Sequence, residues 1–173
     1  MDYYKELNRT LNLDLLQPII QSGLRNAVEF EKLFSLISID NSKVAWRAAW
    51  VCEKISNINP DFYKLGHLEL IIKIAISTDN NGLLRTCLSI LNNLSEPKRI
   101  DVNLLNACYS WLSSQNTPIA VKSLSLKLLC RFSLIEPDLK LELIAYLEHM
   151  DSMSLSQGVQ ATKRNVLKNL NYK

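Results

Sequence analysis

The stretch from Asp40 to Pro60, DNSKVAWRAAWVCEKISNINP, predicts an α-helix that is buried on two sides. Its larger apolar residues recur every three or four positions and so share one stripe of a helix: Val44, Ala48, Val51, Ile55 and Ile58. A second stripe, of small residues, runs beside the first: Ala45, Ala49 and Cys52. The residues 40–42 supply a turn and an N-cap. A helix that is covered on two faces belongs inside a stack of helices.

The first stripe returns three more times along the chain. The copies begin at Leu83, Val121 and Val159, at offsets of 39, 38 and 38 residues. Their members are Leu83, Cys87, Ile90 and Leu94, then Val121, Ser125, Leu128 and Phe132, then Val159, Lys163, Val166 and Leu170. The best match joins residues 81–94 and 157–170, which share Gly, Thr, Leu, Asn and Leu at equivalent positions. A fixed period of this size is typical of stacked helical hairpins.

The helices between these copies are expected to begin near Pro60, Pro97 and Pro137, because proline is tolerated in the first turn of a helix. The helix after Pro60 is expected to bury Leu65, Leu68, Ile72 and Ala75. With 4 Gly, 5 Pro and no alternating apolar and polar pattern, we expect no sheet. The chain is therefore predicted to be one all-α domain over residues 1–173, with an N-terminal cap at 1–23 and repeats at about 26–58, 60–94, 97–134 and 137–170.

Composition and charge favour an ordinary globular domain, with 47% hydrophobic and 21% charged residues. Residues 1–151 hold 16 basic and 17 acidic side chains, and residues 152–173 hold 4 basic and no acidic ones. The body therefore lacks the basic face expected of a strong nucleic-acid binder. The first residues do not resemble a signal peptide, and the longest uncharged run, 102–121, is broken by polar residues and Pro118. We expect a cytoplasmic protein with no membrane span.

Around Val44–Ala49, preceded by Asp40, the chain resembles the second helix of a HEAT repeat. The resemblance covers about residues 26–170 and implies a HEAT- or armadillo-like α-solenoid, a right-handed superhelix of stacked antiparallel helical hairpins. In that family an Asp and an Arg form a ladder between repeats. Carried over, the ladder would pair Asp40 with Arg47 and Asp79 with Arg85. In the third repeat Lys122 lies one position out of register with the ladder arginine. In the fourth repeat Ala161 and Thr162 stand in place of that basic residue.

The last repeat carries polar residues on its predicted buried stripes. Lys163 falls on the first stripe, and Gln160 and Arg164 fall on the second. A terminal repeat has no neighbour beyond it, so a polar outer face is what a stack needs at its end. These three side chains are expected to face water.

Five side chains on the predicted second helices are candidates for binding a partner: Trp50, Arg85, Asn92, Lys122 and Lys127. Each has an alternative role that is only structural. The cations can be solvated or ion-paired on the surface. Trp46 and Trp50 lie four residues apart on the flank of a buried helix, so at least one of them is expected in the core. The Trp-x-x-x-Asn array of armadillo peptide receptors is missing, since Trp46, Trp50 and Trp111 are followed at that spacing by Trp, Lys and Gln.

No sequence pattern indicates catalysis, a metal site or a cofactor. His67 and His149 are isolated and are expected to be exposed. The four cysteines stand singly, without a Cys-x-x-Cys pair, and are interpreted as reduced core thiols: Cys52, Cys87, Cys108 and Cys130. No glycine-rich phosphate loop, nucleophile elbow or zinc pattern occurs.

Two functions follow as hypotheses. The first is a non-enzymatic scaffold or adaptor that binds a protein or peptide along its second helices, which is an inference by analogy of fold. The second is a nucleic-acid binder resembling the DNA alkylation repair glycosylases, which are also built from HEAT-like repeats.

Overall fold

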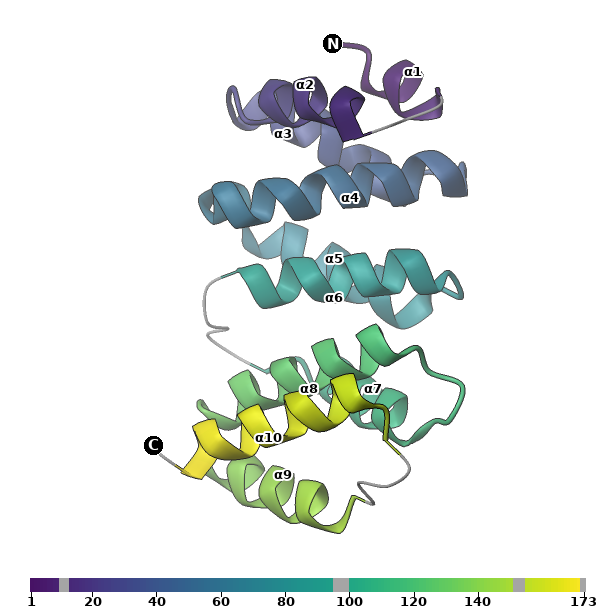
Figure 1. Cartoon of the computed structure of the whole chain (residues 1–173). Helices are drawn as coiled ribbons and strands as arrows, with labels where there is room; N and C mark the ends of the chain where they lie inside the picture. The colour runs from purple at the N-terminus through teal and green to yellow at the C-terminus, as the bar shows by residue number, and fades with distance from the viewer. Residues whose placement is uncertain (10–12, 95–99, 151–154, 172–173) are drawn as a thin grey trace. The chain divides into compact units, whose positions relative to one another are not determined.

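The computed structural model describes residues 1–9, 13–94, 100–150 and 155–171, and these residues form helices and loops without a β-strand (Figure 1). The chain divides into two compact units, Met1–Ser95 and Glu96–Lys173. The helices of the first unit are α1 (Tyr3–Asn8), α2 (Leu13–Gly23), α3 (Ala27–Phe34), η1 (Ser35–Ser38), α4 (Ser42–Ile58), η2 (Pro60–Phe62), α5 (Leu65–Ser77) and α6 (Asn81–Asn93). Those of the second are α7 (Val102–Ser113), α8 (Ile119–Ser133), α9 (Pro137–His149) and α10 (Gln157–Asn171).

Helix α4 is the centre of the first unit. It packs against α1, α2, α3 and η1 on one side and against α6 on the other (Figure 1). Asn41 caps its first turn by accepting a hydrogen bond from the amide of Val44 at 3.2 Å. Ala48 and Ala49 are fully buried, which allows neighbouring helices to approach closely. The prediction of a helix covered on two faces is therefore confirmed.

Helices pair as antiparallel hairpins within each unit. In the first unit α5 packs against α6, and in the second unit α7 packs against α8 while α10 packs against both α8 and α9. Pro137 begins α9 as expected, whereas Pro60 begins the short helix η2 and α5 starts only at Leu65. Pro97 lies outside the described residues. The all-helical repeat fold predicted from the period of 38 to 39 residues is confirmed.

The predicted stripes are buried in all four copies with one exception, Ile58 at the last residue of α4, which is 60% exposed. The buried positions include the polar members Ser125 and Lys163. The burial of Lys163 corrects the expectation that this side chain faces water. Its ammonium donates to the carbonyl of Met150 at 2.8 Å, just beyond the end of α9. Because an amine at the end of a long apolar stem can reach a carbonyl at a helix C-terminus, the residue satisfies that acceptor while its stem fills the core. Gln160 is half-buried and Arg164 is exposed.

Two other predictions about exposure were wrong. Leu65 is 63% exposed, because α5 turns Ile71 and Ala75 toward the core instead. His67 is largely buried, with its ring 4.5 Å from that of Phe34. Its Nε2 lies 2.8 Å from the carboxylate of Glu31, and its Nδ1 accepts a hydrogen bond from the amide of Lys64 at 2.9 Å.

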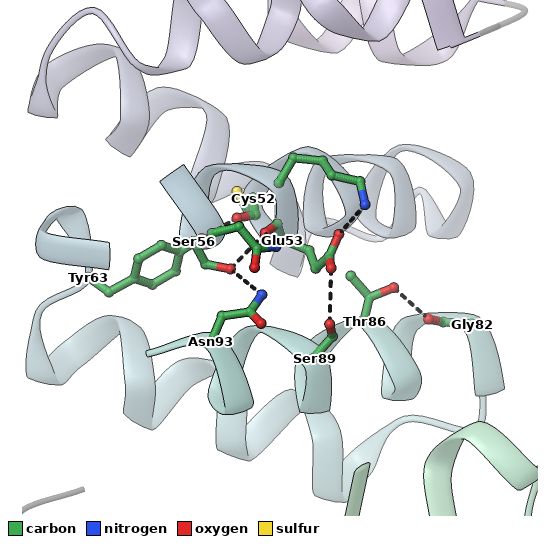
Figure 2. A network of polar contacts seen from close by, with 10 residues as sticks. Cys52, Glu53, Ser56, Tyr63, Gly82, Thr86, Ser89 and Asn93 are labelled. Carbon is green, nitrogen blue, oxygen red and sulfur yellow. Dashed lines mark hydrogen bonds and ion pairs between the residues drawn. The ribbon is translucent and has the colours of Figure 1, made fainter. Parts of the chain in front are cut away.

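Polar side chains join α4 to α6 along one edge of their contact (Figure 2). Ser89 donates to the carboxylate of Glu53 at 3.0 Å, and Asn93 donates to the hydroxyl of Ser56 at 2.9 Å. Ser56 in turn donates to the carbonyl of Glu53 at 2.7 Å. These bonds link residues 36 and 37 positions apart in the chain and fix the register of one repeat on the next.

The two segments with the best internal match also share a local hydrogen bond. Thr86 donates to the carbonyl of Gly82 at 2.8 Å, and Thr162 donates to the carbonyl of Gly158 at 3.0 Å. Both glycines are the second residue of their helix. The α6 and α10 helices are therefore equivalent members of two repeats in local structure as well as in sequence.

Candidate functional site

A groove of about 880 Å³ opens within the second unit, between α7, α8 and α9. Its volume lies in the range of roughly 300–1,000 Å³ that is usual for ligand sites. The residues that line it are Tyr109, Leu112, Ser113, Gln115, Lys122, Glu142, Ala145, Tyr146, His149, Met150 and Leu155. We call this feature the α7–α9 groove.

Two helices present the side chains of the groove at helical spacing. Tyr109 and Ser113 lie one turn apart on α7, and Glu142, Tyr146 and His149 share one face of α9. Helix α7 is capped by Asp101, whose carboxylate accepts a hydrogen bond from the amide of Leu104 at 2.9 Å. Most of the groove side chains are therefore positioned by α-helices and not by loops.

An aromatic pair links α7 to α9 at the groove. The rings of Tyr109 and Tyr146 meet edge to face, with centroids 5.2 Å apart and planes at 75°. The hydroxyls of Tyr146 and Ser113 lie 3.2 Å apart, within hydrogen-bond distance. Burial raises the pKa of Tyr109 to about 12, and the nearby carboxylate of Glu142 acts in the same direction. Tyr109 is an un-ionised phenol at physiological pH. It interacts with the carboxylate of Glu142.

Lys122 and His149 also line the groove. Lys122 is half-buried on α8, and its side chain makes no ion pair or hydrogen bond with the residues that the structure describes. The Nδ1 of His149 lies 2.8 Å from the carbonyl oxygen of Ala145. Because a carbonyl only accepts, Nδ1 carries the hydrogen, and Nε2 is an acceptor in the neutral ring and a donor in the protonated ring.

A model of the HEAT repeat domain matches residues 3–170 of the chain. This chain belongs to the HEAT repeat family. Its fold is similar to the crystal structure of an engineered protein from the Northeast Structural Genomics Consortium, with a TM-score of 0.59 and 14% identity over 98% of this chain and 79% of that one. A designed armadillo repeat protein aligns with a TM-score of 0.45 and 13% identity, covering 98% of both chains. No curated protein matches this chain in sequence.

The sequence-predicted binding residues of this HEAT repeat chain are divided between its two units. Lys122 lines the α7–α9 groove, and Lys127 is exposed on the same helix outside it. Trp50 and Arg85 belong to the first unit, where Trp50 stacks on Trp46 with centroids 6.2 Å apart and Arg85 is exposed on α6. Asn92, also on α6, donates to the carbonyl of Leu88 at 2.9 Å.

The expected HEAT ladder is replaced by other contacts. Arg47 donates to the carbonyls of Leu7, at 2.8 Å, and of Arg9, so it caps the C-terminal end of α1. Neither Asp40 with Arg47 nor Asp79 with Arg85 is among the ion pairs of the described residues. The carbonyls at a helix C-terminus attract a cation, and α1 lies directly against α4.

Sequence reasoning missed most of the α7–α9 groove. It interpreted His149 as an isolated histidine, and this side chain is exposed, as expected, but lines the groove. Glu142 and Tyr146 were not singled out. The spacing of Glu142, Tyr146 and His149 predicts that they share one face of a helix. It does not predict that this face lies opposite Tyr109.

Among the described residues, no group of three or more His, Cys, Asp and Glu side chains is placed to hold a metal ion. No described helix combines the length and apolar character that a membrane crossing requires.

Proposed function

We propose that this HEAT repeat protein is a binding scaffold or adaptor, and that it holds a peptide segment of a protein partner in the α7–α9 groove. The observation that carries this proposal is Lys122, a half-buried cation without an ionic partner among the described residues, at the wall of a groove of about 880 Å³. An ammonium group at the wall of a groove, without an ionic partner, is available to a hydrogen-bond acceptor of a bound ligand.

The composition of the groove supports a peptide more than a nucleic acid. Tyr109, Tyr146 and Leu112 provide apolar and aromatic surface, and a few polar groups are placed around them, which is the usual make-up of a ligand site. The carboxylate of Glu142 would repel a phosphate backbone at the same place. A catalytic role is not part of this proposal, since binding alone accounts for these side chains.

The compartment we propose is the cytoplasm. All four cysteines are free and buried. Unpaired thiols are usual in reducing compartments, whereas exported domains more often use cysteine in disulfides.

The test is selection of peptides on the folded full-length protein from a random displayed library, followed by affinity measurement by fluorescence anisotropy. Lys122→Ala should weaken the selected peptides about tenfold or more, because hydrogen bonds to charged groups contribute roughly 1.5–3 kcal/mol. Lys127→Ala, on the same helix but outside the groove, is the matched control and should bind as the natural protein does. Equal binding by all three proteins would show that the groove is not the site.

The nucleic-acid alternative is checked with the same proteins. A DNA duplex at low salt should not displace a selected peptide. Displacement that weakens steeply as salt is added would instead favour the nucleic-acid hypothesis.

A further inference from the structure

Asn81 and Gly82 form the one Asn-Gly step in the sequence. In such a step the main-chain nitrogen of the glycine can attack the side-chain carbonyl carbon of the asparagine. A succinimide ring then forms, and the side-chain amide group leaves as ammonia with the proton of the glycine nitrogen. Glycine favours this reaction, because it has no Cβ to block the attack and its backbone is the least restricted of all residues. This step is therefore the place in the chain where the covalent chemistry most favours deamidation.

The structure places the reacting side chain in contact with water. Asn81 is exposed as the first residue of α6, and its side chain makes no hydrogen bond with the described residues. The amide of Gly82 is one of the first N–H groups of the helix, which have no acceptor within the helix. It donates instead to the side-chain oxygen of Asn80 at 2.9 Å. One side-chain hydrogen bond therefore holds the nitrogen that carries out the attack.

The closed first turn of α6 opposes the reaction. Ring closure needs the glycine nitrogen and the asparagine Cβ on the same side of the bond between Cα and the carbonyl carbon, and a helical ψ keeps them apart. The turn is held closed by Asn80, which accepts from the amides of Gly82 and Leu83 at 2.9 and 3.0 Å. Because the end of a helix opens at a lower free energy than the whole protein unfolds, this cap controls how often the reacting geometry occurs.

The equivalent helix of the last repeat has a glutamine in place of this asparagine. Helix α10 begins with Gln157 and Gly158. In both helices the glycine carbonyl accepts a hydrogen bond from a threonine one turn later. A glutamine would have to close a larger ring, which is slower because one more rotatable bond must be fixed. The chain therefore carries a reactive and an unreactive side chain on the same local backbone.

We propose that Asn81 is a site of spontaneous deamidation in the folded protein, and that the Asn80 cap sets its rate. The succinimide formed with Gly82 takes up one water molecule, which opens either of the two bonds between its nitrogen and a carbonyl carbon. The product has aspartate or isoaspartate at position 81. One water is consumed and one ammonia is released, so the step needs no oxidant or reductant.

The two products differ in their effect on α6. Aspartate keeps the main chain unchanged and places a carboxylate in the first turn of a helix, where a negative charge is favourable. Isoaspartate adds a methylene group to the main chain directly before Gly82. A Cβ added to Gly82 would already lie 3.1 Å from Nε1 of Trp46, so this part of the contact has little room for a shift. Isoaspartate therefore loosens the packing of α6 on α4.

The experiment incubates the full-length protein at mildly alkaline pH under reducing conditions and follows every asparagine by proteolysis and mass spectrometry. Position 81 should show the mass change of deamidation before any other asparagine, and Gln157 should stay unchanged. Asn80→Ala should accelerate the reaction about fivefold, because it removes the cap that keeps the turn closed. Asn80→Ser keeps a side-chain acceptor and should react at close to the natural rate.

Asn41→Ala is the matched control, because it removes the asparagine cap of α4 and leaves the cap of α6 in place. Position 81 should deamidate in this variant at the natural rate. Equal acceleration by Asn41→Ala and Asn80→Ala would show that the reaction follows unfolding of the whole protein, and would overturn control by the cap. If other asparagines deamidate before Asn81, the proposed site is wrong. Circular dichroism checks that each variant is folded.

The effect on packing is measured on the products. The aspartate and isoaspartate forms are separated by chromatography and unfolded with urea. The isoaspartate form should unfold at the lower urea concentration, and equal midpoints would contradict the loosening of α6.

Discussion

Gly82 shows how a single residue is determined by what lies beside it. A Cβ at this position would lie 3.1 Å from Nε1 of Trp46 and 3.1 Å from the side-chain oxygen of Asn80. The indole nitrogen of Trp46 is buried and has no hydrogen-bond partner among the described residues, and its ring stacks on that of Trp50. A side chain at position 82 would therefore press on the indole of Trp46, where α6 packs against α4.

Gly66 provides a matched comparison, because it is also the second residue of its helix and nothing lies within 4 Å of an added Cβ. Gly66→Ala should raise the free energy of unfolding, by up to about 1 kcal/mol, because alanine favours helix. Gly82→Ala gains the same preference but must displace a packed indole ring, so it should be less stable than Gly66→Ala by roughly 1–3 kcal/mol. Urea denaturation of both variants measures this difference. Equal changes in the free energy of unfolding would show that the indole of Trp46 moves without destabilising the protein.

At the scale of elements, the contact between α4 and α6 has an apolar stripe and a polar edge. Val44, Ala48 and Val51 are fully buried on the α4 stripe. The polar edge contains the pair Ser56 and Asn93, which occupies the late part of both helices (Figure 2). This edge performs the joining role that the Asp and Arg ladder was expected to perform.

A double-mutant cycle tests the polar edge. Ser56→Ala and Asn93→Ala should each destabilise the protein, and together they should cost less than the sum of the two, with a coupling of about 0.5–1.5 kcal/mol for a hydrogen bond between neutral groups. Ser77 is the control partner for Asn93, because it is exposed and its hydroxyl contacts only the carbonyl of Ile74 in its own helix. Additivity in the Ser56 cycle would show that this bond does not join the helices.

At the scale of the whole molecule, each unit has its own core, and each core contains buried thiols. Cys52 and Cys87 lie in the first unit, and Cys108 and Cys130 lie in the second. Burial raises the pKa of Cys87 and of Cys108 to about 12, from an ordinary value of 9.0. The cause is the desolvation of the thiolate, which the core cannot solvate.

These pKa shifts predict alkaline destabilisation. When the pKa of a thiol is higher in the folded than in the unfolded state, its contribution to stability is complete below about pH 9 and is lost as the pH rises toward 12. The free energy of unfolding should therefore fall between pH 8.5 and 10.5, and the fall should be smaller in the double variant Cys87→Ala and Cys108→Ala. Urea denaturation under reducing conditions measures both. The same slope in the two proteins would show that these thiols do not titrate on unfolding.

The helical class and the repeat were predictable because they depend on local order. Apolar residues at three- and four-residue spacing determine which face of α4 is buried. The same pattern recurs after 38 to 39 residues in α6, α8 and α10. Lys163 also lies on a stripe and is buried, contrary to the expectation, drawn from its charge, that it faces water. The N-cap that the sequence predicts within residues 40–42 is supplied by Asn41.

What the sequence determined by itself is therefore the helices, their buried stripes and their repetition, because each follows from residues within a few turns of one another. Only the tertiary structure decided that Arg47 caps α1, that His67 enters an aromatic cluster, and that Lys122, Glu142 and His149 share one groove. These side chains are long or lie at the ends and flanks of helices, where several partners are within reach. The partner that each one contacts depends on how helices distant in the chain pack, and a local pattern does not contain that information.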